Sequence, residues 1–488
     1  MAKINFSNVR KNLSLLLGAE VLIRLMTLVL TIYIARSYGT ATFGIFALAI
    51  AMGSLFEIIS NMGLGTIFLQ RVSGHSAAMP KQLGVFLPLR LILSALGLAL
   101  TIGAAVLLNK NADTFAAIAL SGLYFSIFSI VMFLFCCFDA RQKMQFTAGV
   151  KLFKFSVLFA LGMYIVYLGY PVQYVFIAYI CAAVVAFVIT AALVSRYFAK
   201  ISLVFGAEAR GAWKKIIREG WPITLSGTFV YIYNYLDTII ISVMKGESAV
   251  GLYQVSYKII GTLFILATII NQAYLPKLIE THAGSAAGGG AAGGSAAGGS
   301  AALSTVFNRA LKSIFFWSLP ITFGGIILGE RIIPFVFGDD YLAGIPTFRI
   351  LMLNCIIFFL SSAMVNLLYA LKKQKSAMKI FFLGALANCV FNIFMIPLFG
   401  IEGAAATTVL AETVVLIGIY LLTRKIVRFR VAAGLWRPLL ASIGLCAALY
   451  FTHFESLLLT IGIGATAYFA CYFALSRLGA KSNSARTA

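Results

Sequence analysis

Acidic residues are scarce in this sequence, and charged residues of either sign are few. Asp and Glu together number 15 among 488 residues, against 38 Lys and Arg, and all charged residues make up 11% of the chain. A soluble globule of this size needs a more polar surface than that composition provides. Because 61% of the residues are hydrophobic, we expect lipid rather than water to surround most of the protein.

Cysteine and histidine are also few, and neither is arranged for a common kind of site. The three histidines lie far apart in the sequence, so no cluster has metal-ligand spacing and no metal is expected. All the cysteines fall inside apolar stretches, which argues against a disulfide framework in extracellular loops. They are Cys136, Cys137, Cys181, Cys355, Cys389, Cys446 and Cys471.

Sequence signatures of nucleotide chemistry and of nucleophilic catalysis are missing as well. The chain has no Walker loop, no glycine-rich dinucleotide turn and no nucleophile elbow. We therefore predict no cofactor and no enzymatic activity. Any work that the protein does is expected to draw on an ion gradient, on the membrane voltage or on a concentration difference.

Long apolar runs, in contrast, fill the chain from end to end. Many have the length of about 20 residues that crosses a hydrocarbon core. Residues 91–108 show none of the polar alternation that a membrane β-strand needs. The sequence predicts an all-α polytopic membrane protein with about fourteen transmembrane helices, at residues 13–36, 41–63, 83–107, 114–138, 147–169, 172–195, 221–243, 250–275, 305–329, 347–371, 377–398, 402–423, 434–452 and 456–476.

The basic residues lie mainly on one side of the predicted membrane. If the N-terminus is cytoplasmic, the predicted outer loops contain only Arg36, Lys110, Lys245 and Arg331. An excess of Lys and Arg is typical of cytoplasmic loops. The pattern predicts that both termini are cytoplasmic, and it accounts for the net charge of +23 without a nucleic-acid partner.

The two halves of the chain share short motifs. Residues 39–46 and 246–253 both have Gly-x4-Gly spacing followed by an aliphatic and an aromatic residue. Arg-Gln-Lys at 141–143 similarly resembles Lys-Gln-Lys at 373–375. Internal repeats of this kind are common in polytopic membrane proteins. We predict two pseudo-symmetric six-helix lobes followed by a C-terminal helix pair.

The predicted lobes cover residues 13–195 and 221–423, with a basic cytoplasmic linker at 196–220 and the helix pair at 434–476. The tract from Gly284 to Leu303 interrupts the second lobe with four pentads of Gly, Ala and Ser. Such a composition predicts a flexible coil, because it has little apolar surface to bury. The tract is either an engineered linker or a natural insertion, and we predict no function for it.

Charged residues inside the spans are informative, because each costs about 2.5–3.5 kcal/mol at the centre of a membrane helix without a partner or water. Glu20 and Arg24 lie one turn apart in the first span, and Thr27 and Thr31 continue the same face. This stripe predicts a wall of a wet cavity. The alternative is a Glu20–Arg24 pair that only seals two helices together.

A second polar group lies on the seventh and eighth spans. Gln254 and Lys258 share one helix face, and Asn234 and Asp237 precede them on the seventh span. Lys258 either lines a cavity or extends to the outer interface. Asp237 either carries a coupling ion or is the counter-ion of Lys258, and Glu57 in the second span is the other candidate for ion coupling.

Three further basic residues lie near predicted cytoplasmic ends of spans. Lys151 and Lys154 begin the fifth span, and Arg90 lies near the cytoplasmic end of the third. Long basic side chains at such positions commonly extend to the headgroups, which we favour for the two lysines over cavity lining. We name all three as candidates for a cytoplasmic entrance.

The polar inventory predicts an anion site. Arg24 and Lys258 come from different lobes and would meet across a central cavity. A guanidinium there offers two-point bonding to phosphate oxygens, and an ammonium supplies a point charge, so a pyrophosphate suits the pair. The predicted cavity site consists of Arg24, Lys258, Glu20, Gln254 and Asn234.

A set of short motifs runs from about residue 10 to about residue 425. The motifs are Ala35 to Gly39 with Phe43 to Phe46, Asn61 to Gly65 with Arg71, Val250 to Tyr253 with Lys258, Pro276-Lys277, Phe337 to Asp339, and Gly400 to Ala405. In their order and spacing they resemble the polysaccharide transporter family, the Wzx-type oligosaccharide-lipid flippases of the multidrug/oligosaccharidyl-lipid/polysaccharide exporter superfamily. Members typically have Asp where this chain has Asn61.

The resemblance implies two helical lobes that form a V around a cationic cavity and rock between inward-open and outward-open states. It implies that an undecaprenyl-pyrophosphate-linked oligosaccharide, an O-antigen or exopolysaccharide repeat unit, crosses the bacterial inner membrane. Arg24 and Lys258 match the places where basic residues of relatives engage the pyrophosphate. Membrane lipid, a glycan polymerase and chain-length proteins are then the expected partners.

Three other functions stay open at this point. A flippase for the peptidoglycan lipid precursor would also carry an anionic cargo. A cation-coupled multidrug exporter would favour acidic cavity residues, and Arg24 and Lys258 argue against it. A membrane-embedded glycan ligase would need catalytic groups in a sizeable outer loop, whereas residues 330–346, the longest predicted outer loop, offer only four charged side chains.

Overall fold

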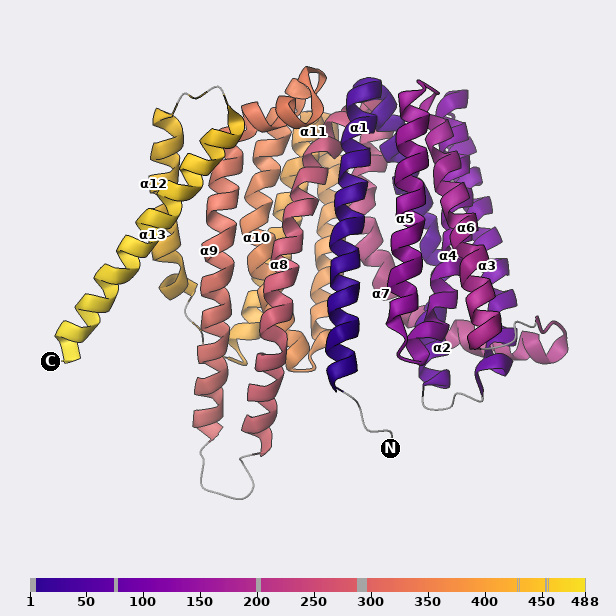
Figure 1. The fold of residues 1–488 in the computed structure, drawn as a ribbon, viewed down its shortest axis with the longest axis horizontal. Coiled ribbons are helices and arrows are strands. Elements are labelled where there is room, and N and C mark those ends of the chain that lie inside the picture. Colours follow the sequence, from indigo (N-terminus) through magenta and orange to yellow (C-terminus); the bar gives the residue numbers. More distant parts are fainter. Residues whose placement is uncertain are drawn as a thin grey trace. The chain divides into compact units, whose positions relative to one another are not determined.

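The computed structural model of the chain consists of long helices (Figure 1). It describes residues 6–73, 78–198, 203–287, 296–427, 431–452 and 456–487, together with residues 429 and 454. This part of the chain forms no β-strand, which confirms the all-α prediction for it. The elements are α1 (Phe6–Asn61), α2 (Leu64–Val72), α3 (Met79–Leu107), α4 (Ala112–Ala140), α5 (Met144–Tyr167), η2 (Val172–Tyr174), α6 (Val175–Tyr197), α7 (Ala207–Lys245), α8 (Glu247–Ala287), α9 (Ala296–Phe337), η3 (Asp339–Gly344), α10 (Ile345–Ala370), α11 (Gln374–Arg424), α12 (Val431–Phe451) and α13 (Leu457–Thr487).

Among the described residues, eleven helices are long and apolar enough to cross a membrane. Two of them, α1 and α11, contain two predicted spans each. A glycine with non-helical dihedral angles separates the two spans, Gly39 in α1 and Gly400 in α11. Their φ values of 74° and 60° are easily reached only by glycine, so the chain changes direction there without strain. The seventh predicted span lies in α7, which is not one of the eleven. Each predicted span thus coincides with a helix.

Contacts along the chain divide it into two compact units, Met1–Gly251 (unit 1) and Leu252–Ala488 (unit 2). The helix α7 and the first residues of α8 belong to unit 1 by this division. The sequence-based lobes instead assign α7 to the second lobe. The arrangement of two six-helix lobes and a C-terminal pair stays a prediction.

The core of unit 1 is aromatic where α2, α3 and α4 meet. The ring of Phe68 lies 5.7 Å from that of Phe86 and 5.2 Å from that of Phe133. Ile216 of α7 is fully buried in the same cluster. Edge-on aromatic contacts and burial together fix these helices side by side. They position the stretch of α3 that carries Arg90.

In unit 2, the C-terminal helices α12 and α13 dock on α9. Leu328 of α9 shares an apolar cluster with Leu445 of α12 and Tyr468 of α13. The Tyr468 hydroxyl donates to the Phe316 carbonyl at 2.7 Å, and Arg331 donates to the Thr460 hydroxyl at 3.1 Å. The pair is therefore tied to α9 by both apolar and polar contacts.

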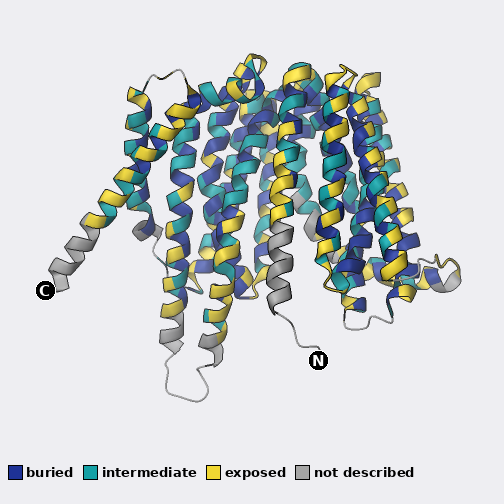
Figure 2. Cartoon of the chain, viewed as in Figure 1, coloured by how far each residue is buried: buried dark blue, intermediate teal, exposed yellow. Residues whose placement is uncertain are grey.

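Large apolar side chains are exposed along the helices of both units, not only at helix ends (Figure 2). Leu25 of α1 is 52% exposed, Val188 of α6 58% and Phe394 of α11 63%. Water would penalise so much exposed apolar surface, whereas lipid would not. The exposure pattern agrees with a protein that lies in a membrane.

The turns confirm part of the internal repeat and correct its register. Gln142 follows α4 and Lys372 follows α10, and each has φ of 56° in the tight turn that begins the next helix. Gln142 therefore matches Lys372 in the structure, whereas the sequence motifs align Gln142 with Gln374, two residues later. Gly39 and Gly246, the first glycines of the shared motif, likewise both have positive φ, at 74° and 85°.

The Gly/Ala/Ser tract is only partly described. The helix α8 continues to Ala287 and α9 begins at Ala296, so the described parts of the tract are helical rather than coiled. Alanine has the highest helix propensity, and an existing helix extends at low cost. Residues 288–295, on which the flexible-coil prediction also falls, lie outside the described residues.

Candidate functional site

Glu20 and Arg24 form an ion pair on α1, the pairing that the sequence offered as the alternative to a cavity wall. Arg24 Nε lies 3.5 Å from Glu20 Oε1, and the side chains are 51% exposed for Arg24 and 47% for Glu20. Further along, the hydroxyl of Thr27 donates to the Ile23 carbonyl, and Thr31 is buried. The stripe is thus exposed at Glu20 and Arg24 and buried at Thr31. The cavity role of the pair stays a prediction.

The polar face of α8 is half-buried at Gln254, Lys258 and Thr262. The Thr262 hydroxyl donates to the Lys258 carbonyl at 2.9 Å. Tyr253 is buried beside this face, where its hydroxyl shares a hydrogen bond of 3.2 Å with Thr408. Arg24 belongs to unit 1 and Lys258 to unit 2, so their meeting across a cavity stays a prediction.

Arg90 is only 2% exposed, and every nitrogen of its guanidinium donates a hydrogen bond. Its Nε and Nη2 donate to the Ser129 carbonyl of α4 at 3.1 and 2.6 Å. Its Nη1 donates to the Ser60 carbonyl at 2.5 Å and to Asn61 Oδ1 at 3.3 Å. Ser60 is next to the last residue of α1, where helix carbonyls lack intrahelical partners. The guanidinium therefore caps α1 and joins it to α3 and α4.

Lys154 of α5 is also buried, at 1% exposure. Its ammonium donates to the Tyr124 hydroxyl at 2.8 Å and lies 3.5 Å from the ring centroid of Phe128 and 4.3 Å from that of Phe155. Aromatic faces attract a desolvated cation, by roughly 2 kcal/mol or more when it is buried. The cation is thus held in an aromatic cage from α4 and α5.

Glu57 brings the two buried cations into one cluster. The carboxylate is half-buried on α1 and interacts electrostatically with Arg90 and with Lys154. We name Glu57, Arg90 and Lys154 the N-terminal charge cluster. The cluster contains one carboxylate and two cations, one from α3 and one from α5. Its net charge is therefore positive when all three groups are ionised.

This cluster differs from the interface that the sequence suggested for Arg90 and Lys154. Lys154 was expected to extend to the headgroups, and for Arg90 that position and a place in a cavity wall were both open, but the structure buries both side chains inside unit 1. The two cations can be buried because other helices supply partners for them: α4 the Ser129 carbonyl and the Tyr124 hydroxyl, and α1 the carboxylate of Glu57. Sequence spacing does not show these partners, since they come from helices far apart in the chain.

Lys151 lies on α5, about one turn nearer to its N-terminus than Lys154. It is half-buried and interacts electrostatically with Asp139, whose Oδ1 accepts a hydrogen bond of 3.3 Å from the Thr147 hydroxyl. The side chain is therefore near the end of α4, unlike Lys154 one turn further into α5. Its role at an entrance stays a prediction.

The two candidate residues of α7 are placed differently. Asp237 is 3% exposed and Asn234 is half-buried, and neither side chain is without a partner. A buried carboxylate in a membrane helix is costly unless it is paired or protonated. Asp237 lies in unit 1 and Lys258 in unit 2, so both the counter-ion and the ion-coupling roles stay predictions.

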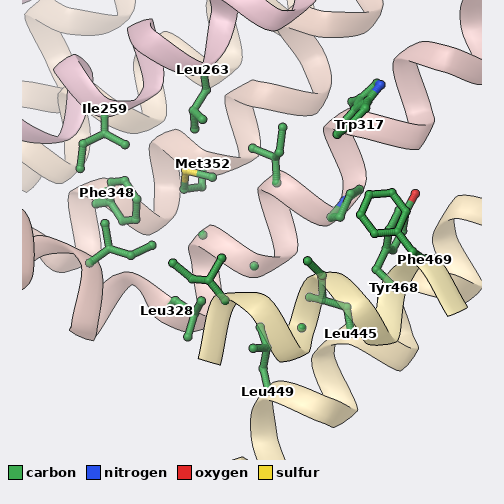
Figure 3. Close-up of a pocket in the computed structure, with 18 residues that line it drawn as sticks. Ile259, Leu263, Trp317, Leu328, Phe348, Met352, Leu445, Leu449, Tyr468 and Phe469 are labelled. Atoms are coloured by element: carbon green, nitrogen blue, oxygen red, sulfur yellow. The ribbon is translucent and has the colours of Figure 1, made fainter. Parts of the chain in front are cut away.

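Sequence reasoning missed an apolar cavity of about 330 Å³ in unit 2. Residues of α8, α9, α10, α12 and α13 line it. Figure 3 shows Leu263, Trp317, Met352, Leu445 and Phe469, one from each of these helices, around the cavity. Ligand sites usually occupy about 300–1,000 Å³. The cavity has the size and chemistry to accept an apolar chain. It depends on how five helices meet, which no sequence motif indicates.

The Tyr124 hydroxyl gives a first test of the cluster. Tyr124→Phe is expected to lower the free energy of unfolding by about 1.5–3 kcal/mol, because it removes a hydrogen bond to a buried ammonium. Tyr274→Phe is the matched control, since that hydroxyl bonds the neutral Ser313 hydroxyl at 2.9 Å and should contribute only about 0.5–1.5 kcal/mol. Thermal unfolding of the purified protein measures both. Equal losses would contradict an ionised Lys154.

The long apolar helices define a polytopic membrane protein. Comparison with known families narrows this class. The family model described as "Polysaccharide biosynthesis protein" matches residues 9–282, and the chain belongs to that family.

Individual relatives are distant. The chain is 24% identical to the uncharacterized membrane protein MJ1068 of Methanocaldococcus jannaschii over 59% of this chain and 55% of the relative, so the match spans about half of that protein. It is 21% identical to the probable flippase AglR of Haloferax volcanii, over 81% of this chain and 79% of the relative.

A solved structure shares the fold. The Lipid II flippase MurJ in an inward closed conformation superposes with a TM-score of 0.77, covering 95% of this chain and 99% of that one, at 15% sequence identity. At that identity the likeness shows the fold alone. It agrees with the helical polytopic architecture described above.

Proposed function

We propose that the protein is a flippase that moves a lipid-linked glycan across a membrane. The observation that carries the proposal is the match of a polysaccharide biosynthesis family to a chain built of membrane-spanning helices. The relative named as a probable flippase supports it. A sugar chain is too polar to cross the hydrocarbon layer unaided, so a protein of this class must offer it a polar path.

The proposed cargo is an undecaprenyl-pyrophosphate-linked oligosaccharide, such as an O-antigen or exopolysaccharide repeat unit. Arg24 and Lys258, assisted by Glu20, Gln254 and Asn234, would bind the pyrophosphate and the first sugars. The half-exposed state of Arg24 supports this role, because a ligand can reach the guanidinium. Phosphate oxygens accept two parallel bonds from Arg and one strong bond from Lys.

We assign energy coupling to Asp237 and Glu57. Glu57 interacts electrostatically with two buried cations, so gain or loss of its proton would change the charge of the N-terminal charge cluster. Lys151 is the proposed residue of the cytoplasmic entrance. Arg90 and Lys154, which were grouped with it, are proposed instead to set the electrostatics of the cluster, since both are buried.

The proposed setting is the bacterial inner membrane, with both termini cytoplasmic. The concentration of Lys and Arg in the predicted cytoplasmic segments supports that orientation. Membrane lipid surrounds the helices, and the proposed protein partners are a glycan polymerase and chain-length proteins, which use the glycan after it has crossed.

The apolar cavity of unit 2 is proposed to receive part of the polyprenyl chain. Its lining side chains are apolar, and the hydroxyl of Tyr468 is turned to the Phe316 carbonyl instead of into the cavity. Moving apolar surface from water into a protein cavity is favourable by about 25 cal/mol for each Å² buried. A polyprenyl chain already lies in lipid, so entering the cavity adds only the van der Waals contacts with the lining side chains. The cavity would therefore position the lipid more than hold it tightly.

Filling the cavity tests this use. A Cβ at Gly324 would lie 4.0 Å from Leu445, so Gly324→Leu can enter the cavity without a backbone clash. We expect a roughly tenfold fall in transport of a long-chain cargo, equal to about 1.4 kcal/mol, and no change for a short-chain analogue. Gly103→Leu, at a glycine with open space beside it, is the control. An equal effect on both chain lengths would contradict the proposal.

The alternatives make different predictions. A peptidoglycan-precursor flippase would accept the same anionic headgroup, and the shared fold with the Lipid II flippase keeps it as a second candidate. A cation-coupled multidrug exporter would bind cations where this chain has Arg24 and Lys258. A glycan ligase would form a new glycosidic bond instead of moving an intact cargo.

Complementation in cells separates these candidates. A bacterial host that lacks its own glycan flippase should regain surface glycan when it makes this protein. Regained growth of a host depleted of its peptidoglycan-precursor flippase, without surface glycan, would favour the second candidate. Drug resistance alone would favour the exporter. Failure in all hosts at normal protein levels would overturn the flippase proposal.

A further inference from the structure

The first part of α7 lies across one end of unit 1. The Trp213 indole donates to the Val85 carbonyl, in the second turn of α3, at 2.8 Å. A Cβ at Gly220 would lie 2.2 Å from the Met62 carbonyl oxygen, just after the end of α1. Residues 209–221, which we call the surface helix, are therefore held by one face against the side of unit 1 that the sequence predicts to be cytoplasmic.

The end of α3 that holds the surface helix is close to lipid. Ile92 and Leu96, further along α3, are large apolar side chains that are exposed, as expected of a helix that faces lipid. Val85 precedes Ile92 by two helical turns, about 11 Å. The headgroup layer beside the hydrocarbon core is about 5–8 Å thick. The surface helix therefore lies at about the depth of the headgroups.

The outward face of the surface helix is basic. Arg210, Lys214 and Arg218 are exposed and follow one another at intervals of four residues, so they share that face. We call these three residues the basic stripe, and Lys215 is exposed beside it. Like charges one turn apart repel each other and destabilise a helix slightly. An anion bound across the stripe would relieve that repulsion.

The acidic residue of the surface helix does not neutralise this charge. Glu219 Oε2 accepts a hydrogen bond of 2.6 Å from Arg71 Nη2 of α2. The Arg71 guanidinium also lies 5.4 Å from the ring centroid of Phe86, so the pair is fixed against α2 and α3. Among the residues that the structure describes, no ion pair includes Lys215 or a residue of the basic stripe. The surface helix thus presents uncompensated positive charge.

Exposed aromatic rings flank the basic stripe. Trp221 is 56% exposed and comes eleven residues after Arg210, which places it on the same face. Phe205, just before the helix, is 63% exposed and lies edge-on to Trp213 at 6.5 Å. Aromatic side chains are enriched at the depth of the headgroups. The rings therefore favour a lipid surface over a soluble acidic protein as the partner.

We propose that the surface helix binds the headgroups of anionic phospholipids in the adjacent leaflet. Phosphate oxygens accept strong hydrogen bonds from Arg and Lys, and basic residues grouped on an amphipathic helix attract anionic lipid. Bound lipid would hold the start of α7, which continues towards Asn234 and Asp237. The site does not depend on the flippase proposal, because lipid binds there whether or not a cargo moves.

Stabilisation by added lipid tests the site. The purified protein in a non-ionic detergent is titrated with phosphatidylglycerol, and the midpoint of thermal unfolding reports the apparent affinity. Arg210→Gln, Lys214→Gln and Arg218→Gln combined should lower that affinity about a hundredfold, since each cation near a charged lipid surface contributes about a fivefold factor. Phosphatidylcholine should stabilise wild type and variant alike. Equal affinity of both proteins for phosphatidylglycerol would overturn the proposal.

A matched control removes the same charge elsewhere. Lys373→Gln, Lys375→Gln and Lys425→Gln combined alter exposed lysines at other predicted cytoplasmic positions and should change the affinity by less than about threefold. Arg210→Lys with Arg218→Lys keeps the charge of the basic stripe and should keep most of the affinity. A loss in the control equal to that in the stripe variant would show a general charge effect and overturn the site.

Two further measurements identify the occupant. Affinity of the wild-type protein for phosphatidylglycerol should fall roughly tenfold between about 50 mM and about 500 mM sodium chloride, because salt screens exposed charges. No salt dependence would contradict binding by the basic stripe. Polyglutamate and undecaprenyl pyrophosphate are titrated in the same way. A stripe variant that loses affinity for either of these but keeps it for phosphatidylglycerol would assign the stripe to an acidic protein or to the cargo, and would overturn the proposal.

Discussion

Reversing the two proposed pyrophosphate ligands together, with Arg24→Glu and Lys258→Glu, is expected to lower glycan transport about a hundredfold or more at normal protein levels. Each charge-assisted hydrogen bond to the cargo is worth about 1.5–3 kcal/mol, so losing two removes about 3–6 kcal/mol before repulsion is counted. A loss of that size corresponds to roughly 10²–10⁴ in affinity. Transport is measured by the surface glycan of a complemented host.

Two variants separate cargo binding from effects on folding. Arg349→Glu reverses a comparable cation that pairs with Glu330 at 2.9 Å on a partly exposed surface, and it should keep most transport. Glu20→Gln removes only the partner of Arg24, and it should keep or raise affinity for the anion, since it frees the guanidinium. Full surface glycan with both charges reversed would contradict the pyrophosphate site.

Removing the buried guanidinium of Arg90 is expected to cause the largest loss of stability of any substitution considered. Arg90→Met leaves the Ser60 and Ser129 carbonyls without this donor and Glu57 with one cation fewer. Breaking a buried charge arrangement by deleting one member typically costs about 3–5 kcal/mol. The free energy of unfolding in detergent, or the midpoint of thermal unfolding, should show it.

The stability loss should depend on Glu57. Adding Glu57→Gln to Arg90→Met is expected to recover part of the lost stability, because the half-buried carboxylate no longer needs a counter-charge. Lys277→Met, which breaks an exposed pair with Glu280, is the control and should cost under about 1 kcal/mol. Equal losses for Arg90→Met and Lys277→Met would show that the N-terminal charge cluster is not a stabilising feature.

Much of the fold could be predicted from the sequence, because its main signals are local. Apolar runs of membrane-spanning length identify the helices, and the repeated Gly-x4-Gly motif links two positions, Gly39 and Gly246, that both have positive φ in the structure. The Glu20–Arg24 pair was also predictable, since it depends only on one turn of a single helix. Periodicity and chain length are sufficient for features of this kind.

The features that were not predictable depend on which helices meet. The position of Lys154 near the start of its span suggested an extended side chain, yet Tyr124 and Phe128 of α4 form a cage for it. The cavity lined by Leu445 and Phe469 requires α12 and α13 to dock on α9. The contact of Gly44 with Glu247 joins residues about two hundred positions apart, and only the repeat hinted that they are related.

Transport by the purified protein in liposomes tests the proposed flippase activity directly. Undecaprenyl-pyrophosphate-linked N-acetylglucosamine is placed in the inner leaflet, and a soluble lectin measures the sugar that appears outside. We expect the sugar to appear outside with the wild-type protein, and about a hundredfold less with Arg24→Glu and Lys258→Glu combined. Liposomes without protein should show only the background leak. Sugar that stays inside with the wild-type protein, under an imposed ion gradient as well as without one, would contradict the proposed activity.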